Sequence, residues 1–174
     1  MPSRLVAAAL AVLVLSPAAL AEGPGLGRVA TPDDIACWDI SIGPDGAGLP
    51  PGRGTPKQGE AVYAEKCVVC HGEKGAGKPN DQLVGKRGSL SGDQAPVKTV
   101  GSFWPYATTL FDYIRRAMPL SASKSLSDDE VYSVAAYLLQ LNCIIGEADT
   151  MDARTLPRVQ MPNRDGFVNF TRTK

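Results

Sequence analysis

The sequence is poor in the residues on which many cofactor and nucleic-acid sites depend. Only one of its 174 residues is a histidine, His71, and aromatic residues make up 6%. Its 18 basic side chains are balanced by 18 acidic ones, and this lack of a basic excess argues against a nucleic-acid-binding protein. The single histidine excludes any site that needs two imidazoles from this chain.

The sequence also lacks an apolar run long enough to span a bilayer, which takes about 20 residues. The apolar run at residues 5–15 is shorter; it follows Arg4 and precedes Ala19-Leu20-Ala21, a small-x-small cleavage site. This order is typical of a secretory signal peptide over residues 1–21, with a membrane anchor as the alternative. We therefore expect export to the periplasm, cleavage near Ala21, and a mature form without a membrane span.

Glycine and proline dominate the next segment. Residues 22–54 therefore predict an extended arm. A helix is expected to follow, because Thr55 and Gln58 form a capping box around Pro56 at the first helical position. Gly59 lowers the stability of such a helix, so its presence predicts close approach by another backbone.

Two more helices are expected further along the chain. Apolar residues at helical spacing predict one over Tyr106–Ala117, which Pro119 ends. The clearest helix is Asp128–Asn142, which begins with a second capping box at Ser127 and Glu130. We predict an all-α fold, since no strand alternation and no βαβ pattern is present.

The remaining segments have no regular pattern. Residues 72–102 are rich in Gly, Lys, Asp and Ser and predict a long loop, which in a compact domain is usually functional or wrapped around something. Residues 147–174 predict a mixed-charge tail. The predicted organisation is a signal peptide, an arm, one domain over residues 55–146, and this tail.

The chemistry is concentrated at Cys67-Val-Val-Cys70-His71. Two cysteines separated by two residues and followed by histidine form the attachment signature of haem c. Each thiol adds across one haem vinyl group, and the adjacent imidazole becomes the proximal iron ligand. A thioredoxin-like redox pair would need a βαβ context, and a zinc site would need a further Cys or His pair close by. We therefore predict one covalently attached haem.

The sixth iron ligand is approached by exclusion. His71 is already used, so methionine, lysine, a thiolate or an open position remain. Met118 is favoured, because Pro119 forces a turn between two helices and lets the thioether leave the helix. Met151 and Met161 lie in the predicted tail, and Met118 could also be an ordinary core methionine.

The order of helix, haem motif, long loop, Met118 and final helix resembles class I cytochrome c. Gly59 and Tyr63 in the first helix and Tyr137 in the last match the helix-crossing positions of that fold. The resemblance covers about residues 55–146. It implies that a proline carbonyl after the motif, here that of Pro79, accepts a hydrogen bond from the proximal imidazole.

The flanking segments resemble a narrower family, the SoxD-like cytochrome subunits of sulfur or sulfite dehydrogenases. The stretches that carry this likeness are Trp38–Ile40, Gly43–Gly46, Gly48–Gly52, Thr99–Leu110 and Met161–Phe167. The likeness implies an electron-accepting partner of a molybdenum-cofactor dehydrogenase acting on sulfane sulfur or sulfite, with a downstream cytochrome c as acceptor. Some members carry two haem domains, whereas this chain has one haem motif.

Two cysteines lie outside the motif. Cys37 and Cys143 form an even remainder in an exported chain, which predicts a disulfide from the arm to the end of the last helix. Two buried thiols, a disulfide to a partner, or a thiol that carries substrate sulfur are the alternatives.

Three further side chains are candidates for binding the haem. Trp104, Tyr106 and Arg115 could anchor the haem propionates, since buried carboxylates need donors. Core aromatics and a solvated arginine are the alternative interpretation.

Three functions are compatible with these features. The first is an electron-transfer subunit of a sulfur- or sulfite-oxidising dehydrogenase, which is not an enzyme on its own. The second is a free electron shuttle, for which the two arms would be surplus. The third is a haem enzyme, which needs an open or thiol-ligated iron and is disfavoured by Met118.

Overall fold

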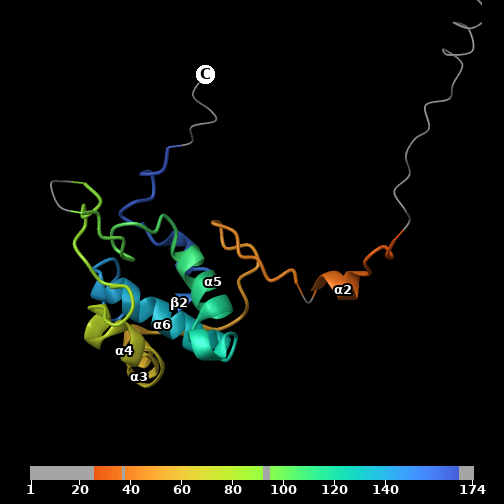
Figure 1. Cartoon of the computed structure of the whole chain (residues 1–174), viewed down its shortest axis with the longest axis horizontal. Helices are drawn as coiled ribbons and strands as arrows, with labels where there is room; N and C mark the ends of the chain where they lie inside the picture. The colour runs from red at the N-terminus through yellow and green to blue at the C-terminus, as the bar shows by residue number, and fades with distance from the viewer. Residues whose placement is uncertain (1–25, 37, 92–94, 169–174) are drawn as a thin grey trace, which may run out of the picture. The chain divides into compact units, whose positions relative to one another are not determined.

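The computed structural model describes residues 26–36, 38–91 and 95–168. The chain forms two units, Met1–Asp39 and Ile40–Lys174, and each is considered by itself (Figure 1). The predicted signal peptide, residues 1–21, lies outside the described residues. Within residues 26–36, 38–91 and 95–168, no helix has the length and apolar character needed to cross a membrane.

Helices dominate the second unit, which we call the compact unit. They are packed around α6, and long irregular segments connect them (Figure 1). In chain order the described elements are α2 Pro32–Ala36 in the first unit, then β1 Arg53–Gly54, α3 Pro56–Lys66, α4 Val68–His71, the 3₁₀ turn η1 Glu73–Gly75, α5 Ala107–Ala117, η2 Leu120–Ala122, α6 Asp128–Leu141, β2 Met151–Asp152 and η3 Leu156–Arg158.

The predicted helix boundaries are confirmed to within a residue. Thr55 and Gln58 form the expected capping box of α3, and Ser127 and Glu130 form that of α6. Each box satisfies backbone N–H groups that the first helical turn leaves without partners. The helix α5 ends at Ala117 and is capped by Met118, where the backbone becomes extended before Pro119.

The crossing of α3 and α6 organises the core. A side chain at Gly59 would overlap the carbonyl of Ser133, so the two helix backbones approach each other as the sequence predicts. One turn later, the rings of Tyr63 and Tyr137 pack with their centroids 5.4 Å apart. A glycine followed by an aromatic pair therefore sets the distance between the helix that carries the haem motif and the last helix.

The segments flanking the predicted haem domain pack on the compact unit. β1 pairs antiparallel with β2, with Gly54 opposite Met151. Leu156 and Met161, in the predicted tail, are 0% and 3% exposed, and the Tyr132 hydroxyl donates to the Pro50 carbonyl over 2.9 Å. The compact unit therefore extends beyond residues 55–146 on both sides.

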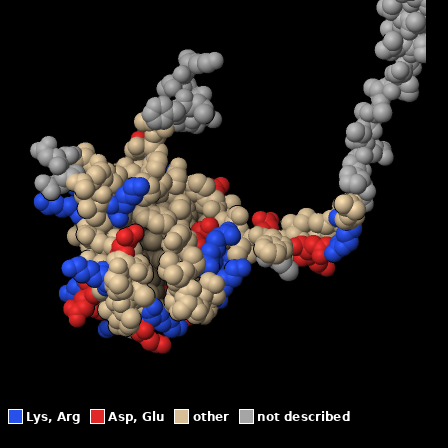
Figure 2. All heavy atoms as spheres, in the orientation of Figure 1, with Lys and Arg blue, Asp and Glu red and all other residues tan. Residues whose placement is uncertain are grey.

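The N-terminal unit is held together by local polar contacts. Asp34 accepts hydrogen bonds from the Thr31 backbone N–H and hydroxyl and pairs with Arg28 over 2.8 Å. The large apolar side chains of this N-terminal unit are exposed; they are Leu26, Val29, Ile35 and Trp38. Figure 2 shows basic and acidic side chains next to each other on this unit, where Arg28 pairs with Asp34, and mixed charges over the visible face of the compact unit.

Candidate functional site

The turn of α4 brings the three residues of the haem motif to one side. Cys67 caps α4, and its carbonyl accepts hydrogen bonds from the N–H groups of Cys70 (3.1 Å) and His71 (3.0 Å). Residues three and four positions apart lie on one face of a helical turn. Two thiols and an imidazole are therefore presented together on a segment of five residues.

The imidazole of His71 is oriented by a backbone carbonyl. Its Nδ1 lies 3.0 Å from the carbonyl oxygen of Asp81, and as the donor in this hydrogen bond Nδ1 leaves Nε2 with a lone pair for a metal. The sequence prediction gave this acceptor role to Pro79 and is corrected here. The loop turns back at this point, since the Lys78 N–H donates to the Asn80 carbonyl. Because of this turn, the carbonyl of Asp81, two residues after Pro79, is the one that reaches the imidazole ring.

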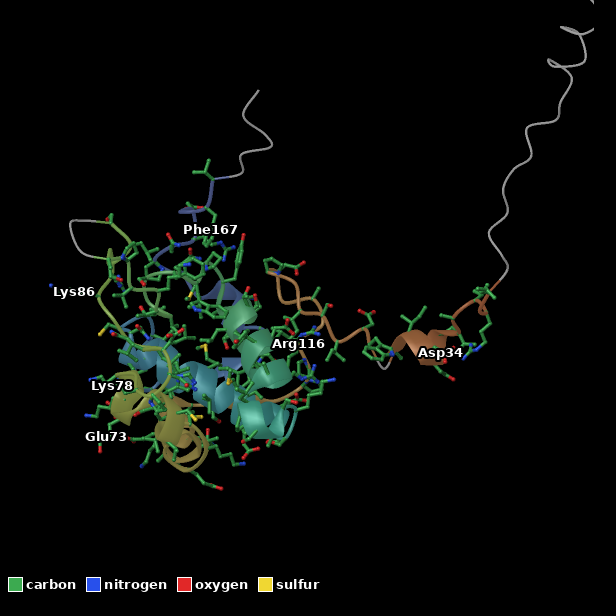
Figure 3. All side chains as sticks on the ribbon, in the orientation of Figure 1. Asp34, Glu73, Lys78, Lys86, Arg116 and Phe167 are labelled. Carbon is green, nitrogen blue, oxygen red and sulfur yellow. The ribbon has the colours of Figure 1, made fainter. Side chains whose placement is uncertain are left out.

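Further backbone bonds hold the motif on its loop side. The Gly77 N–H donates to the His71 carbonyl over 2.8 Å, and the Asn80 N–H donates to the Cys70 carbonyl over 2.9 Å. The Tyr63 hydroxyl donates to the Gly72 carbonyl over 2.9 Å. Figure 3 shows Lys78 on the outer side of this loop. The charged side chains of the loop therefore face solvent, while its backbone supports the motif.

The two motif thiols have different surroundings. Cys67 is partly buried and Cys70 is exposed. Burial, and then the neighbouring Cys70, raises the pKa of the Cys67 thiol to about 11. Cys67 is thus the motif thiol that packs against the apolar core.

Met118 occupies the position expected of a ligand that leaves a helix. It caps the C-terminus of α5 with extended backbone, and it is only partly buried against the core. Met151 and Met161, by contrast, are 4% and 3% exposed and belong to the core. Their thioethers are used in packing, and the role of Met118 as the sixth ligand stays a prediction.

The donor set and its surroundings fit a haem c. The motif supplies two thiols and a metal-binding nitrogen, and the apolar side chains of Val68, Leu83 and Trp104 are incompletely buried against the core. A porphyrin is a large apolar ring that needs such side chains on its faces. Cys67 and Cys70 would hold the group covalently, and His71 would bind its iron.

The three predicted propionate anchors are engaged with protein partners. The Trp104 ring packs edge-on against Tyr113. The Arg164 guanidinium lies 4.4 Å from the centre of the Tyr106 ring. The Nε of Arg115 donates to Asp128 over 2.9 Å. These contacts support the alternative interpretation of the three residues as structural, and binding to haem propionates stays a prediction.

The predicted disulfide cannot be placed. Cys37 lies outside the described residues, whereas Cys143 is exposed just after α6. The backbone at Cys143 is left-handed, with φ 55°, and its carbonyl accepts a hydrogen bond from Arg87 over 2.7 Å. The pairing of Cys37 with Cys143 stays a prediction.

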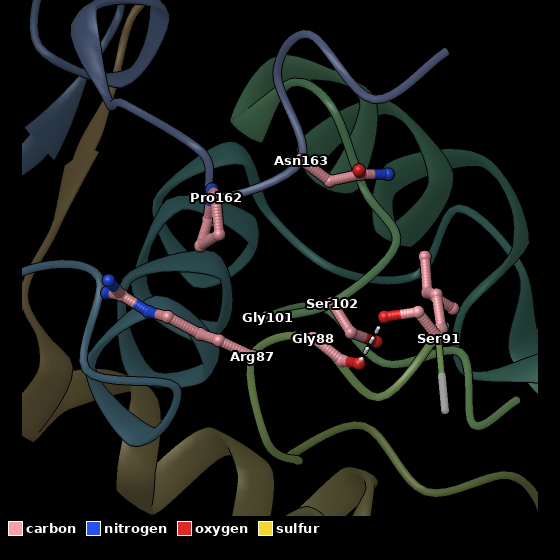
Figure 4. A pocket seen from close by; sticks show the side chains of 8 residues that line it. Arg87, Gly88, Ser91, Gly101, Ser102, Pro162 and Asn163 are labelled. Carbon is pink, nitrogen blue, oxygen red and sulfur yellow. Dashed lines mark hydrogen bonds between the residues drawn. The ribbon is translucent and has the colours of Figure 1, made fainter. Parts of the chain in front are cut away.

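A polar hollow lies where the C-terminal segment meets the loop after the motif (Figure 4). Arg87, Ser102 and Asn163 are among the residues that line it. Their polar groups have protein partners, such as the Phe103 carbonyl for Asn163. None of the predicted site residues lines this hollow.

Comparisons with known proteins agree with the haem motif. The family model described as cytochrome c oxidase, cbb3-type, subunit III matches residues 54–138. A chain of the sulfane dehydrogenase SoxCD from Paracoccus pantotrophus is similar with a TM-score of 0.78 and 39% identity, covering 87% of this chain and 75% of that one. The chain belongs to the c-type cytochromes. Its fold is that of class I cytochromes c, and it binds haem c covalently.

Curated relatives match this cytochrome over part of their length. A thiosulfate dehydrogenase from Psychrobacter arcticus is 35% identical over 83 residues, which are 48% of this chain and 25% of that protein. A thiosulfate dehydrogenase from Allochromatium vinosum is 29% identical over 120 residues, 69% of this chain and 40% of that protein. The chain thus spans a quarter to two fifths of the length of these relatives.

Sequence reasoning missed two contacts around the loop that follows the motif. Asp81 acts through its backbone carbonyl, which has no side-chain signature. Asn142 is 6% exposed at the end of α6 and bonds to Leu83 and Gly85 in the loop. An asparagine at the end of a predicted helix reads as an ordinary cap, so the signal that could have found it is absent from the local sequence.

Proposed function

We propose that this cytochrome accepts electrons from a molybdenum-cofactor dehydrogenase that oxidises a sulfur compound, and passes them to a downstream cytochrome c. The likeness to the SoxCD chain carries the proposal. It covers 87% of this chain at 39% identity, whereas the family model matches only residues 54–138. The likeness therefore includes the flanking segments, which a generic haem domain would not share.

The residues of the site suit electron transfer. The bound haem supplies an iron that exchanges one electron. His71 is oriented by Asp81, and Met118 would close the opposite face of the iron to small ligands. A methionine ligand gives a higher reduction potential than a second imidazole would, which suits acceptance of electrons from a dehydrogenase.

The proposed setting is the periplasm. Residues 1–21 have the pattern of a secretory signal peptide, and covalent attachment through Cys67 and Cys70 accords with an exported cytochrome.

The two flanks of the compact unit pack on its own core, whereas the N-terminal unit leaves Ile35 and Trp38 exposed. Such side chains suit contact with a second subunit.

Native purification tests the proposal. The cytochrome is isolated from its own periplasm at low salt, and the haem-containing peak is assayed for molybdenum. We expect molybdenum and a larger subunit to co-elute, and sulfite or thiosulfate to change the haem absorbance. Elution of the cytochrome alone, without molybdenum, would favour the free electron shuttle.

A second candidate follows from the names of the curated relatives. Since both are thiosulfate dehydrogenases, the cytochrome could itself be the domain of an enzyme that oxidises thiosulfate. The recombinant haem-loaded protein is mixed with thiosulfate in the absence of other proteins. Rapid change of its haem absorbance would favour this candidate, while no change leaves the role of an electron-accepting subunit.

A further inference from the structure

The amide of Asn142 bonds to the backbone of the loop that follows the haem motif. Its Oδ1 accepts from the Gly85 N–H over 3.2 Å, and its Nδ2 donates to the Leu83 carbonyl over 3.3 Å. In a parallel sheet, one residue accepts from and donates to residues two apart on its neighbour in the same way. The side chain therefore takes the place of a parallel strand beside residues 83–85.

The amide is itself well anchored. Asn142 is 6% exposed, and its Nδ2 also donates to the Leu138 carbonyl in the last turn of α6 over 2.8 Å. Gly101 makes room for it, because a side chain there would lie 2.6 Å from the Asn142 Oδ1. The rigid end of α6 is thereby joined to the loop (Figure 1).

The joined segment leads directly to the haem-ligating histidine. Leu83 is bonded on its other side, where its N–H donates to the Gly75 carbonyl over 2.8 Å. Asp81 lies two residues earlier, and its carbonyl oxygen is 3.0 Å from the His71 Nδ1. The acceptor thus lies between Asn80, which is bonded to Cys70, and a strip of backbone held by Gly75 on one side and by Asn142 and the Val100 N–H on the other.

We propose that Asn142 is a positioning residue for the axial histidine: it holds residues 83–85 so that the Asp81 carbonyl keeps its hydrogen bond to His71. A firm bond at Nδ1 makes the imidazole a stronger donor to the iron. Asn142 thereby helps to set the reduction potential of the haem, although its side chain bonds to the loop backbone and not to the ring.

The single histidine makes a direct test possible. Labelling the holoprotein with ¹⁵N-histidine gives signals from one imidazole, because His71 is the only histidine in the chain. Solvent exchange of its Nδ1–H is measured in the reduced protein, together with the haem potential. Asn142→Leu, which has neither donor nor acceptor, is expected to speed exchange about tenfold and to raise the potential.

Two further variants keep the test decisive. Asn142→Asp accepts from Gly85 but, when ionised, cannot donate to Leu83, so a smaller change in the same direction is expected even if the leucine variant fails to fold. Tyr132→Phe is the matched control, since it removes a hydrogen bond to the Pro50 carbonyl away from this loop. It should lower stability and leave both readouts unchanged.

The proposal is overturned by a purely structural outcome. The Asn142 variants that fold are compared with the wild type in urea. If these folded variants are less stable but keep the wild-type exchange rate and haem potential, the amide serves stability alone. The same conclusion follows if Tyr132→Phe moves both readouts as far as Asn142→Asp does.

Discussion

The apolar side chains of the N-terminal unit are exposed, whereas those in the flanks of the compact unit are buried. Leu156 and Met161 in the C-terminal flank are 0% and 3% exposed, whereas Ile35 and Trp38 in the N-terminal unit are 51% and 84% exposed. Both regions lie outside the haem motif and both read as irregular in sequence. The difference teaches that an irregular segment can be part of a core. Whether it is depends on its hydrogen bonds to distant parts of the chain.

The pairing differs in its range. The flanks bond over long sequence separations, as β1 does with β2 and the Arg53 N–H does with Asp129 over 2.8 Å. In the N-terminal unit the bonds reach no further than from Arg28 to Asp34 among the residues described. Such local bonds order a short segment by itself.

The largest expected effect is the loss of helical structure from the compact unit when no haem can be attached. The double change Cys67→Ala/Cys70→Ala prevents haem attachment. We expect the compact unit to lose most of its helical circular dichroism, because the haem supplies core volume that few aromatic residues can replace. A haem-free variant with native-like helical circular dichroism would contradict this prediction.

A pair of glycine substitutions sharpens the comparison. Gly59→Ala is expected to destabilise the compact unit by about 3 kcal/mol or more, since the added methyl overlaps the Ser133 carbonyl. Gly27→Ala is the contrasting change: nothing lies within 4 Å of a methyl there, so its cost is limited to the strain of a left-handed backbone, with φ 87°, in the N-terminal unit. Urea unfolding should detect the first change and not the second, and equal effects would mean that both regions unfold together.

Truncation of apolar side chains tests the same boundary. Leu156→Ala is expected to cost about 2–4 kcal/mol, because it leaves a cavity under the C-terminal flank. Trp38→Ser should leave the unfolding midpoint of the isolated protein unchanged, since the ring is 84% exposed. A Trp38→Ser protein of lower midpoint would show that the N-terminal unit packs on the core in solution.

The smallest effect concerns an ion pair between α3 and α6. Lys66 donates to Glu130 over 2.7 Å, and this bond, with those from Ser127, holds the pKa of Glu130 below its usual value. The stabilisation is therefore present above the ordinary glutamate pKa, about 4.3, and is lost as the pH falls through the lower native value.

Glu130→Gln isolates this contribution. The amide oxygen can still accept from Ser127, so the capping bonds are kept while the charge is removed. The variant should have a slightly lower urea midpoint at pH 7, and the difference should disappear in acid. A midpoint difference that is the same at both pH values would assign the effect to the cap and not to the ion pair.

Local features of the fold were predictable from sequence. The two capping boxes and the close approach at Gly59 depend on residues within one turn or on the absence of a side chain, and the structure confirms them. The motif at Cys67, Cys70 and His71 was predictable for the same reason, because its five residues carry the whole of the attachment chemistry.

Features that depend on distant pairing were not predictable. The flank at Met151–Met161 was predicted as a tail because its partners, such as Gly54, lie about a hundred residues earlier. Asp81 replaces Pro79 as acceptor because the fold of the loop, and no side chain, decides which carbonyl reaches the imidazole. Asn142 contacts Leu83 and Gly85 because the fold places the loop beside the end of α6.

The pairing of β1 with β2 also bears on the order in which the protein can fold. Gly54 lies near the start of the compact unit, and its partner Met151 lies about a hundred residues later in the chain. Contacts between such distant residues form slowly, because a long loop must close first. The pairing of β1 with β2 is therefore expected to form late in folding, after the local contacts of α3 and α4 around the haem motif.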